Sequence, residues 1–426
     1  MASPLTVAVF VGTRADLGPL SPVLEALQSA DDLTLRVLTG VMYAADDLVA
    51  ALPTSASEDV WRAAVVSLAE PMSEVTVGAQ LEQGAMLARA AGQALRAEGI
   101  DVLVVLGDRW ELLYVVPAAV LLGIPVVHLH GGEVTEGALD ERVRHAVTKL
   151  ADQHCVASED AAARVRQLGE PGDRVHVTGA PGLDRLAGAA PIPDAELADL
   201  IGAVPADVSG DLPDDLPDDP PGTTVERPLA LFTYHPPTAQ PGAPVGEWAR
   251  EAAEAALATC GTVVATHPGM DEGRDEILGA LTELAAREPR LRLVPALGRD
   301  YPRVLAAADV VVGNSSSGVI EAATVHVPAV DIGERQRGRL RGDNVVHAAE
   351  GRAAVEAALR TALSPRWREH SARVTNPYGS GSASARILAI VRTAALAPRV
   401  KHFVDLASAP QAGPDRSRST NEEEEE

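Results

Sequence analysis

The stretch HLHGGEVTEGALDERVRHAVTKL, from His128 to Leu150, gathers histidines and carboxylates directly after the apolar run GIPVV. Imidazoles and carboxylates can move protons near neutral pH, so this stretch is a candidate for acid–base chemistry. Glu133 precedes the expected helix and follows a strand end. Ligands gather at that edge of open α/β sheets, so we interpret Glu133 as facing a ligand.

Two other interpretations of this stretch stay open beside acid–base chemistry. His128, His130 and Glu133 could converge on a metal ion, but no HExxH or comparable spacing supports a metal site. The pairs Asp140–Arg144 and Glu141–His145 have i,i+4 spacing on an apolar-faced helix, so part of the charge is typical of a helix surface. We favour acid–base carboxylates and predict no metal.

Polar side chains also follow other apolar runs. LGDRWELL places Asp108 and Arg109 after one expected strand, and FTYHPPT and THPG place His235 and His267 after two others. A lone histidine is usually a polar residue with a structural partner. Two of them at strand ends raise the expectation of a shared site.

Three segments could bind an anion. VFVGTRADLG places Arg14 in a strand–helix turn, where helix N–H groups and a guanidinium favour phosphate, although a solvated Arg in a tight turn is equally compatible. VVVGNSSSGVIEA combines three hydroxyls, a glycine and, one turn later, a carboxylate that could hold a ribose; plain helix capping is the alternative. The residues concerned are Ser315, Ser316, Ser317, Gly318 and Glu321. The third segment, IGERQRGRLRGDNVV, is basic in an otherwise acidic chain, and we take Arg337 and Arg341, among its arginines at 335, 337, 339 and 341, as ligand-binding.

The elements that position these residues are short, continuous, aliphatic runs that alternate with Ala- and Leu-rich helical stretches. Such runs are typical of strands buried on both faces of a parallel sheet, so the sequence predicts an α/β, doubly wound fold. The expected strands are Leu5–Val11, Leu33–Leu38, Val102–Leu106, Val126–His130, His154–Ala157, Arg174–Thr178, Leu229–Thr233, Thr262–Thr266, Leu291–Val294, Val310–Gly313 and Ala329–Ile332.

The alternation breaks once, in the Pro- and Asp-rich stretch Pro205–Arg227, which we predict to be disordered. Two similar α/β halves joined near it are the simplest architecture. The tail ends in five glutamates and is also predicted to be disordered. The longest apolar run, Leu112–Val127, is interrupted by Pro and Gly and is short for a bilayer span, so we interpret it as a buried helix and a buried strand.

Composition narrows the function classes. The 426-residue chain is 46% hydrophobic and 3% aromatic, with a formal net charge of −24. The charge disfavours nucleic acids and anionic membranes as partners, and the low aromatic content disfavours base-stacking platforms. Two cysteines outside any metal spacing make no disulfide framework, and the first residues read as a strand rather than a signal peptide. We expect a cytoplasmic protein.

Taken together, the motifs resemble the UDP-N-acetylglucosamine 2-epimerases, and more closely the hydrolysing branch that feeds sialic-acid-type pathways. The matching motifs fall in order from residue 11 to about 390: GTRADLG, LGDRWELL, HLHGGEVTEGALDERVRHAVTKL, GAPGLD, FTYHP, NSSSGVIEA, IGERQRGRLRGDNV and NPYGSGSASARI. This sequence has GTRAD where the resemblance to the non-hydrolysing branch implies GTRPE, and this difference favours the hydrolysing branch. Leu17 stands where the family suggests an aromatic residue, which leaves sugar stacking there in doubt.

The resemblance implies a GT-B architecture, with two Rossmann-like domains and the site in the cleft between them. We expect an N-terminal domain over 1–189, a UDP-binding domain over 190–375 containing the acidic insert at 205–227, a helix over 376–400 that crosses back, and a disordered tail over 401–426. It further implies that Arg14, His267, Ser315–Gly318, Glu321, Arg337 and Arg341 bind the UDP-sugar. Asp108, Glu133, Asp140 and His235 are then the catalytic residues.

The implied reaction eliminates UDP to give a 2-acetamidoglucal and then adds water, releasing N-acetylmannosamine and UDP without a cofactor. The alternatives are the same chemistry on a UDP-2,4-diacetamido-6-deoxy-glucose, a non-hydrolysing 2-epimerase, a GT-B glycosyltransferase, or a nucleotide-sugar sensor without turnover. The assignment of base and acid among Asp108, Glu133 and Asp140 stays open. We expect a homo-oligomer, either a dimer or a tetramer.

Overall fold

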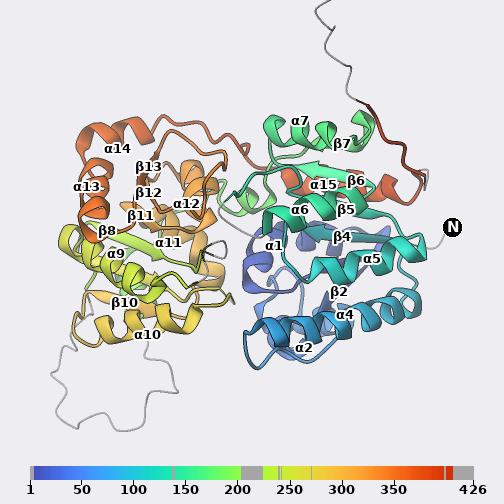
Figure 1. Ribbon diagram of the computed structural model, residues 1–426, viewed down its shortest axis with the longest axis horizontal. Helices are drawn as coiled ribbons and strands as arrows, with labels where there is room; N and C mark the ends of the chain where they lie inside the picture. The colour runs from blue at the N-terminus through green and yellow to red at the C-terminus, as the bar shows by residue number, and fades with distance from the viewer. Residues whose placement is uncertain are drawn as a thin grey trace, which may run out of the picture.

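A computed structural model describes residues 4–136, 140–202, 224–237, 240, 242–269, 271–397 and 400–405. Figure 1 shows two lobes side by side, an N-terminal lobe in blue and green and a C-terminal lobe in yellow and orange. The predicted acidic insert lies outside the described residues except for 224–227, and so do residues 406–426 of the predicted tail.

The N-terminal lobe is built on a parallel sheet whose strands, among the described residues, follow the order β3-β2-β1-β4-β5-β6-β7. Each neighbouring pair runs parallel, as in Leu5↔Leu33 between β1 and β2. The strands are β1 (Leu5–Phe10), β2 (Leu33–Thr39), β3 (Val65–Ser67), β4 (Val102–Leu106), β5 (Val126–Leu129), β6 (Gln153–Val156) and β7 (Val175–Val177).

The C-terminal lobe repeats this pattern with a second parallel sheet in the order β10-β9-β8-β11-β12-β13. Its strands are β8 (Leu229–Thr233), β9 (Thr262–Thr266), β10 (Leu291–Val294), β11 (Val310–Gly313), β12 (Ala329–Ile332) and β13 (Val345–Ala348). In both sheets the order reverses beside the first strand, which is the doubly wound arrangement. The predicted fold class of two Rossmann-like domains is therefore confirmed.

Helices connect the strands and cover the sheets. In chain order they are α1 (Arg14–Gln28), α2 (Ala45–Ala51), α3 (Glu58–Ala64), α4 (Val77–Ala97), α5 (Leu112–Leu122), α6 (Asp140–Leu150), α7 (Glu159–Gln167), α8 (Asp194–Gly202), α9 (Val245–Thr259), α10 (Arg274–Ala285), α11 (Tyr301–Ala307), α12 (Ser316–Ile320), α13 (Arg352–Ala362), α14 (Pro365–Ser371) and α15 (Ala383–Ala394). Short 3₁₀ helices span Gly172–Arg174, Pro181–Arg185, Gly298–Asp300 and Ala322–Val325.

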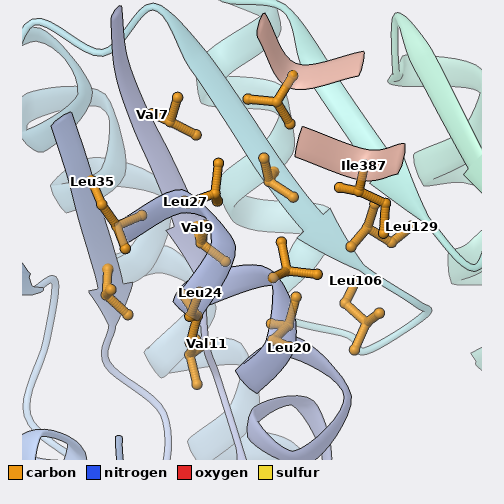
Figure 2. Packing of buried hydrophobic residues seen from close by; sticks show 14 of the residues in the cluster. Val7, Val9, Val11, Leu20, Leu24, Leu27, Leu35, Leu106, Leu129 and Ile387 are labelled. Carbon is orange, nitrogen blue, oxygen red and sulfur yellow. The ribbon is translucent and has the colours of Figure 1, made fainter. Parts of the chain in front are cut away.

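The last helix lies on the N-terminal lobe, although the chain reaches it from the C-terminal one (Figure 1). In Figure 2, Ile387 of α15 points toward Leu129 of β5, within the apolar cluster that also holds Val9 and Leu24. Burial of this apolar surface is what attaches α15 to the first sheet. Asp184 strengthens the attachment by accepting bonds from the Ala383 and Ser384 N–H groups, at 2.9 and 2.8 Å.

The chain beyond α15 also contacts the N-terminal lobe. Lys401 Nζ donates to the carbonyl oxygens of Lys149 and Ala151, at 2.7 and 2.6 Å, and pairs with buried Glu170 at 2.8 Å. These contacts lie at the C-terminal end of α6, where a cation is favourable. Lys401 belongs to the segment over 401–426 that we expect to be disordered, and these contacts place its side chain against the N-terminal lobe.

The long apolar run forms α5 and β5 where the sequence predicts a helix and a strand. Strand β5 is buried, as expected. Helix α5 buries Leu112, Val115 and Ala119 against the sheet, but Leu121 on its other side is 87% exposed. The expectation of a buried helix is therefore correct for the face against the sheet and wrong for the opposite face. Among the described residues no helix is both long enough and apolar enough to cross a membrane.

Candidate active site at the boundary between the two lobes

Loops that follow strands of both sheets contact one another at the boundary between the lobes. Arg14, after β1, donates from Nη1 to the Pro295 carbonyl oxygen, after β10, at 2.7 Å. Arg109, after β4, pairs with Asp271, after β9, at 3.2 Å. The Glu136 N–H donates to the Arg337 carbonyl oxygen at 3.1 Å. The carboxyl edges of the two sheets therefore face each other, which brings the residues predicted at strand ends into one region.

Asp108 is neutralised from behind by a buried arginine. The Arg144 guanidinium forms an ion pair with the Asp108 carboxylate, and the Arg144 side chain is 1% exposed. Its Nη1 also donates to the Glu133 carbonyl oxygen at 2.9 Å and to Thr135 Oγ1 at 3.1 Å. Arg144 on α6 thus holds the ends of β4 and β5 in one arrangement. Because the ion pair of Asp108 with Arg144 is direct, whereas Glu133 lies 3.6 Å from its nearest guanidinium, Asp108 is less suited to proton transfer than Glu133.

Glu133 is buried and stays ionised. Its Oε1 lies 2.5 Å from His130 Nδ1, and its Oε2 lies 3.6 Å from Arg339 Nη2 of the other lobe. Burial alone would raise the pKa of Glu133, but His130 and Arg339 outweigh burial and lower it. The hydrogen bond to Glu133 fixes the His130 ring, while His128 has a different partner: its Nε2 donates to the Gly107 carbonyl oxygen at 2.7 Å. The two histidines therefore do not converge on one point.

Asp140 has the opposite electrostatic character. It is the first residue of α6 and half-buried, close enough to Arg109 and Asp271 for their charges to act on it. Burial raises the pKa of Asp140, although the Arg109 charge opposes the change. Glu133 and Asp140 are therefore two carboxyl groups whose environments move their pKa values apart. That is the property expected of a base and an acid that work on one substrate.

His235 is a neutral imidazole with a defined tautomer. Its Nδ1 accepts a hydrogen bond from the Gly269 N–H at 2.9 Å, so the ring proton is on Nε2. Burial lowers the pKa of His235 to about 3, and the Arg335 charge adds to the effect. Asn314 holds its backbone from both sides: Oδ1 accepts from the His235 N–H at 2.7 Å and Nδ2 donates to its carbonyl oxygen at 2.8 Å. His235 can therefore donate a hydrogen bond near neutral pH but cannot supply a positive charge.

The serine loop follows β11 where the sequence predicts it. Ser315 is the N-cap of α12, and its Oγ lies 3.4 Å from both the N–H and the Oγ of Ser317. Ser316 and Gly318 lie in the same half-buried turn. A Cβ on Gly318 would make only ordinary contacts of 3.6 Å, whereas one on Gly313, at φ 133°, would lie 2.0 Å from the Thr233 carbonyl oxygen. The protein itself therefore requires glycine at 313, not at 318.

Glu321 ends α12 and lies next to the N-terminal lobe. Tyr301 donates its hydroxyl to Glu321 Oε2 at 2.7 Å. A Cβ built on Gly182, in the 3₁₀ helix Pro181–Arg185, would lie 3.4 Å from Oε1. Burial raises the pKa of Glu321, while the Tyr301 hydrogen bond opposes the change. One carboxylate oxygen is thus occupied by Tyr301, and the other is next to the opposite lobe.

The basic loop turns alternate arginines to opposite sides. The Arg339 side chain is 9% exposed, and Arg335 donates from Nη1 to the Asn314 carbonyl oxygen at 3.1 Å. Arg337, which we expected to bind ligand, is 65% exposed and lies 3.3 Å from Glu136 and 3.5 Å from Glu334. Arg341 is bonded to buried Asp331 at 2.8 Å. The structure therefore brings Arg335 and Arg339 to the lobe boundary, whereas Arg337 points to solvent and Arg341 anchors the loop.

The first strand–helix turn is closed by its own carboxylate. Asp16 accepts hydrogen bonds from the Gly12 and Thr13 N–H groups, at 3.2 and 2.7 Å, so these two groups are not available to an anion. This differs from the expectation that the turn's N–H groups bind phosphate and leaves Arg14 as the cation there. His267, half-buried after β9, is near enough for the Arg14 charge to act on it; burial, with Arg14, lowers the pKa of His267.

Several buried polar atoms at this boundary have no hydrogen-bond partner among the described residues. They are the Nε atoms of Arg109, Arg335 and Arg339, Nε2 of His130 and both Oε atoms of Glu111. Glu111 is fully buried, with Oε1 3.8 Å from Arg109 Nε. An unpaired buried donor costs about 1–3 kcal/mol. Three guanidiniums with free buried donors around one boundary are therefore suited to an anionic ligand that supplies the missing acceptors.

Some residues at this boundary were not predicted from the sequence. Asp271 follows His267 by four residues in the loop after β9, and Asn314 precedes the three serines. Tyr301 lies at the start of a helix distant in sequence from Glu321. The first two could have been found from their place just after a strand. Nothing in the local pattern around Tyr301 indicates its hydrogen bond.

The chain is similar to known proteins over most of its length. A family model described as UDP-N-acetylglucosamine 2-epimerase matches residues 65–392. The chain is 31% identical to a Legionella pneumophila UDP-N,N′-diacetylbacillosamine 2-epimerase (hydrolyzing), over 90% of this chain and 94% of that one. It is 27% identical to a Neisseria meningitidis UDP-N-acetylglucosamine 2-epimerase, over 80% and 83%. A crystal structure of a Neisseria meningitidis UDP-GlcNAc 2-epimerase bound to UDP-GlcNAc shares the fold, with a TM-score of 0.68, 16% identity, and coverage of 91% and 100%.

Proposed function

Because this chain belongs to the UDP-N-acetylglucosamine 2-epimerase family, we propose that it is a hydrolysing enzyme that converts UDP-GlcNAc to N-acetylmannosamine and UDP. The 31%-identical relative carries the word hydrolyzing in its name, which supports this branch of the family. We propose that the reaction takes place between the lobes, in the cytoplasm, without a cofactor.

In the first step, the Glu133 carboxylate removes the proton from C2 of the sugar while the C1–O bond breaks and UDP leaves with the bonding electrons. Glu133 suits this role because His130 and Arg339 keep it ionised. A base positioned at a weakly acidic C–H contributes about 10²–10⁴-fold to rate. The product of this step is a 2-acetamidoglucal.

In the second step, Asp140 gives a proton to C2 from the other face while water adds at C1 and releases its proton to solvent. Glu133 then loses its proton to solvent and Asp140 regains one, which restores the starting state. The raised pKa of Asp140 favours the protonated form that this step needs. The net change is hydrolysis of the sugar–diphosphate bond with inversion at C2. Asp108 serves as a fixed neighbour rather than a proton carrier, because Arg144 already neutralises it.

Negative charge develops on the departing diphosphate. The observation that carries the proposal is that buried guanidiniums there each keep one donor without a hydrogen-bond partner among the described residues. Arg109 and Arg335 each keep a buried Nε without an acceptor. Together with Arg14 and the neutral His235 Nε2–H, they stabilise that charge. Stabilisation of charge that develops in the transition state is usually the largest single contribution to catalysis. We propose that Ser315–Gly318 hold the diphosphate, Glu321 the ribose, and His267 the UDP near Arg14.

A second substrate is supported by the name of the 31%-identical relative, a UDP-N,N′-diacetylbacillosamine 2-epimerase. A hollow of about 10 Å³ also lies beside Arg109. Its lining is apolar except for Gln80 and Arg109, and it includes Val41, Met42, Met72, Val75 and Trp110. A space of this size accepts about one methyl- or water-sized group. A UDP-2,4-diacetamido-6-deoxy-glucose carries methyl groups that UDP-GlcNAc lacks, so we propose it as the second candidate for the same chemistry.

Product analysis tests the proposal. The purified chain is incubated separately with UDP-GlcNAc and with the diacetamido sugar, without any acceptor, and followed by proton NMR. We expect release of UDP together with a free sugar inverted at C2. Formation of a UDP-linked epimer would instead establish the non-hydrolysing reaction. Absence of turnover with tight UDP binding would favour a sensor, and turnover only after adding an acceptor sugar would favour a glycosyltransferase.

A further inference from the structure

Glu111 is a buried carboxyl to which the proposed reaction assigns no role. The residue is fully buried, and neither of its Oε atoms has a hydrogen-bond partner among the described residues. A Cβ built on Gly12, in the turn after β1, would lie 2.4 Å from Oε1, so the carboxyl packs directly against that turn. An ionised carboxylate is costly in such a place, because burial removes water without replacing its hydrogen bonds. Glu111 therefore gains more from protonation than a carboxyl that has donors around it.

The charge that opposes protonation of Glu111 comes from Arg109. Oε1 of Glu111 lies 3.8 Å from Nε of Arg109, and this Nε has no hydrogen-bond partner among the described residues. Burial raises the pKa of Glu111 to about 7, although the Arg109 charge opposes the change. The charges of Asp16, on α1, and Asp271, in the loop after β9, add to the effect of burial. Ionisation of Glu111 thus depends on how much of the Arg109 charge acts on it.

Glu111 is also the carboxyl near Arg109 that is least able to stay ionised. Asp16 accepts hydrogen bonds from two backbone N–H groups, at 3.2 and 2.7 Å. Asp271 is paired with Arg109 at 3.2 Å; burial would raise the pKa of Asp271, but the nearby guanidinium charges outweigh burial and lower it. Asp140 is only half-buried. A further negative charge beside Arg109 is therefore expected to neutralise Glu111 first.

We propose that Glu111 takes up one proton from solvent when the diphosphate of UDP binds beside Arg109. The bound anion brings new negative charge to the guanidinium and competes with the Glu111 carboxylate for it. The proton resides on a Glu111 oxygen while UDP is bound and returns to solvent when UDP leaves. Glu111 then balances charge without contacting the sugar. This inference rests on the proposed function in one respect, the binding of UDP between the lobes.

Proton uptake gives UDP binding a defined dependence on pH. A ligand whose binding takes up one proton binds more weakly as the pH rises, by up to about ten-fold per pH unit. Because the pKa of Glu111 in the free protein is about 7, this dependence begins near that pH. At lower pH the carboxyl is already protonated before UDP binds, so Glu111 no longer changes the affinity. Alkaline pH therefore favours the release of UDP.

The test is calorimetric titration of the purified chain with UDP at pH 8, in HEPES and in Tris buffer. The ionisation enthalpies of these buffers differ, so the difference between the two observed heats gives the number of protons taken up. UDP itself supplies or takes up none at this pH, because the last pKa of a phosphate ester is about 6. We expect the wild type to take up more than about half a proton per UDP, and Glu111→Gln to take up almost none.

The direction of the affinity change separates charge balance from a structural role. Glu111→Gln resembles the protonated carboxyl, so at pH 8 it should bind UDP up to about ten-fold more tightly than the wild type. At pH 6 the two proteins should bind UDP about equally. If Glu111 only held Arg109 in place, the substitution would weaken binding at both pH values. Circular dichroism checks that the variant is folded.

Two further variants show whether the proton belongs to Glu111. Glu136→Gln removes a carboxyl that is 57% exposed at the same boundary, and it should leave the uptake unchanged. Asp140→Asn should also keep the uptake, because Glu111 is still present. No uptake in the wild type, uptake retained or binding weakened at pH 8 in Glu111→Gln, or uptake lost in either of these two variants would overturn the inference and leave the proposed function intact. A chain that does not bind UDP would overturn both.

Discussion

Glu133→Gln tests the central chemical assignment. The side chain is 5% exposed, and its two oxygens face His130 at 2.5 Å and Arg339 at 3.6 Å. Glutamine has nearly the same shape but cannot accept a proton. We expect turnover to fall by about 10²–10⁴-fold, the usual contribution of a general base. At about 1.4 kcal/mol per factor of ten, that equals roughly 3–6 kcal/mol of barrier.

The same substitution should have a limited effect on folding and on UDP affinity. It replaces one charge-assisted hydrogen bond, with His130, by a neutral one, a loss of about 1.5–3 kcal/mol at most. UDP is proposed to be held by other residues, so its dissociation constant should change less than about three-fold, or roughly 0.7 kcal/mol. Urea unfolding and calorimetric titration with UDP measure these two quantities.

Two assays locate the step that Glu133 serves. In D₂O, the wild type should exchange the C2 hydrogen and release UDP, whereas Glu133→Gln should do neither. Asp140→Asn should still release UDP but accumulate the 2-acetamidoglucal. Glu136→Gln is the control, because Glu136 is three residues away yet 57% exposed, and its ion-pair partner among the described residues is exposed Arg337. Near-normal turnover in Glu133→Gln, or an equal loss in Glu136→Gln, would refute the assignment.

Three further changes test the electrostatics of the site and of the core. Arg335→Met should weaken UDP binding by about 10–150-fold, which corresponds to the loss of a charge-assisted hydrogen bond of roughly 1.5–3 kcal/mol. Arg337→Met is the control, because Arg337 is two residues away but 65% exposed, and it should change UDP affinity less than about three-fold. Titration with UDP measures both affinities, and equal losses would contradict the orientation of the loop. Burial lowers the pKa of His128 to about 3, so the unfolded chain binds a proton that the folded chain refuses, and stability should fall as the pH drops below about 6.5, by about 1.4 kcal/mol per pH unit. Urea midpoints of His128→Asn should show a shallower acid dependence than those of the wild type, and an unchanged dependence would remove His128 as its source. Burial raises the pKa of Glu111 to about 7, so the contribution of this carboxyl to the free energy of unfolding falls as the pH rises from about 4.5 to 7. Glu111→Gln should therefore be more stable than the wild type by about 3 kcal/mol at pH 8 but not at pH 4.5. A variant that is less stable at pH 8 would contradict the lack of a hydrogen-bond partner for this carboxyl among the described residues.

Local pattern was enough to predict eleven strands, but not two of the four edge strands among the described residues. The eleven expected strands all form, including the edge strands β7 and β10, and most are apolar runs of the kind that a sheet buried on both faces accommodates. Strands β3 (Val65–Ser67) and β13 (Val345–Ala348) were missed. They are short edge strands with half-exposed side chains, so their sequences lack that signal, and pairing with β2 and β12 decides their structure.

The orientation of the loop arginines was decided by residues distant in sequence, from both lobes. The sequence places arginines at 335, 337, 339 and 341 after β12, with nothing to distinguish them. Contacts with Asn314 and Glu133 turn Arg335 and Arg339 inward, while Glu136 holds Arg337 at the surface. These partners are distant in sequence, so their choice is not encoded in the periodicity of the loop.

Apolar runs and short motifs were enough to predict the fold class, the family and the placement of titratable residues at strand ends, because they carry that information locally. The folded arrangement was needed to show that Arg144 neutralises Asp108, that His130 and Arg339 keep Glu133 ionised, and that one side of α5 stays exposed. Ionisation and exposure depend on the distances to charges and surfaces supplied by other segments. Those distances exist only once these segments have come together, within the N-terminal lobe for Arg144 and Asp108 and between the lobes for Arg339 and Glu133.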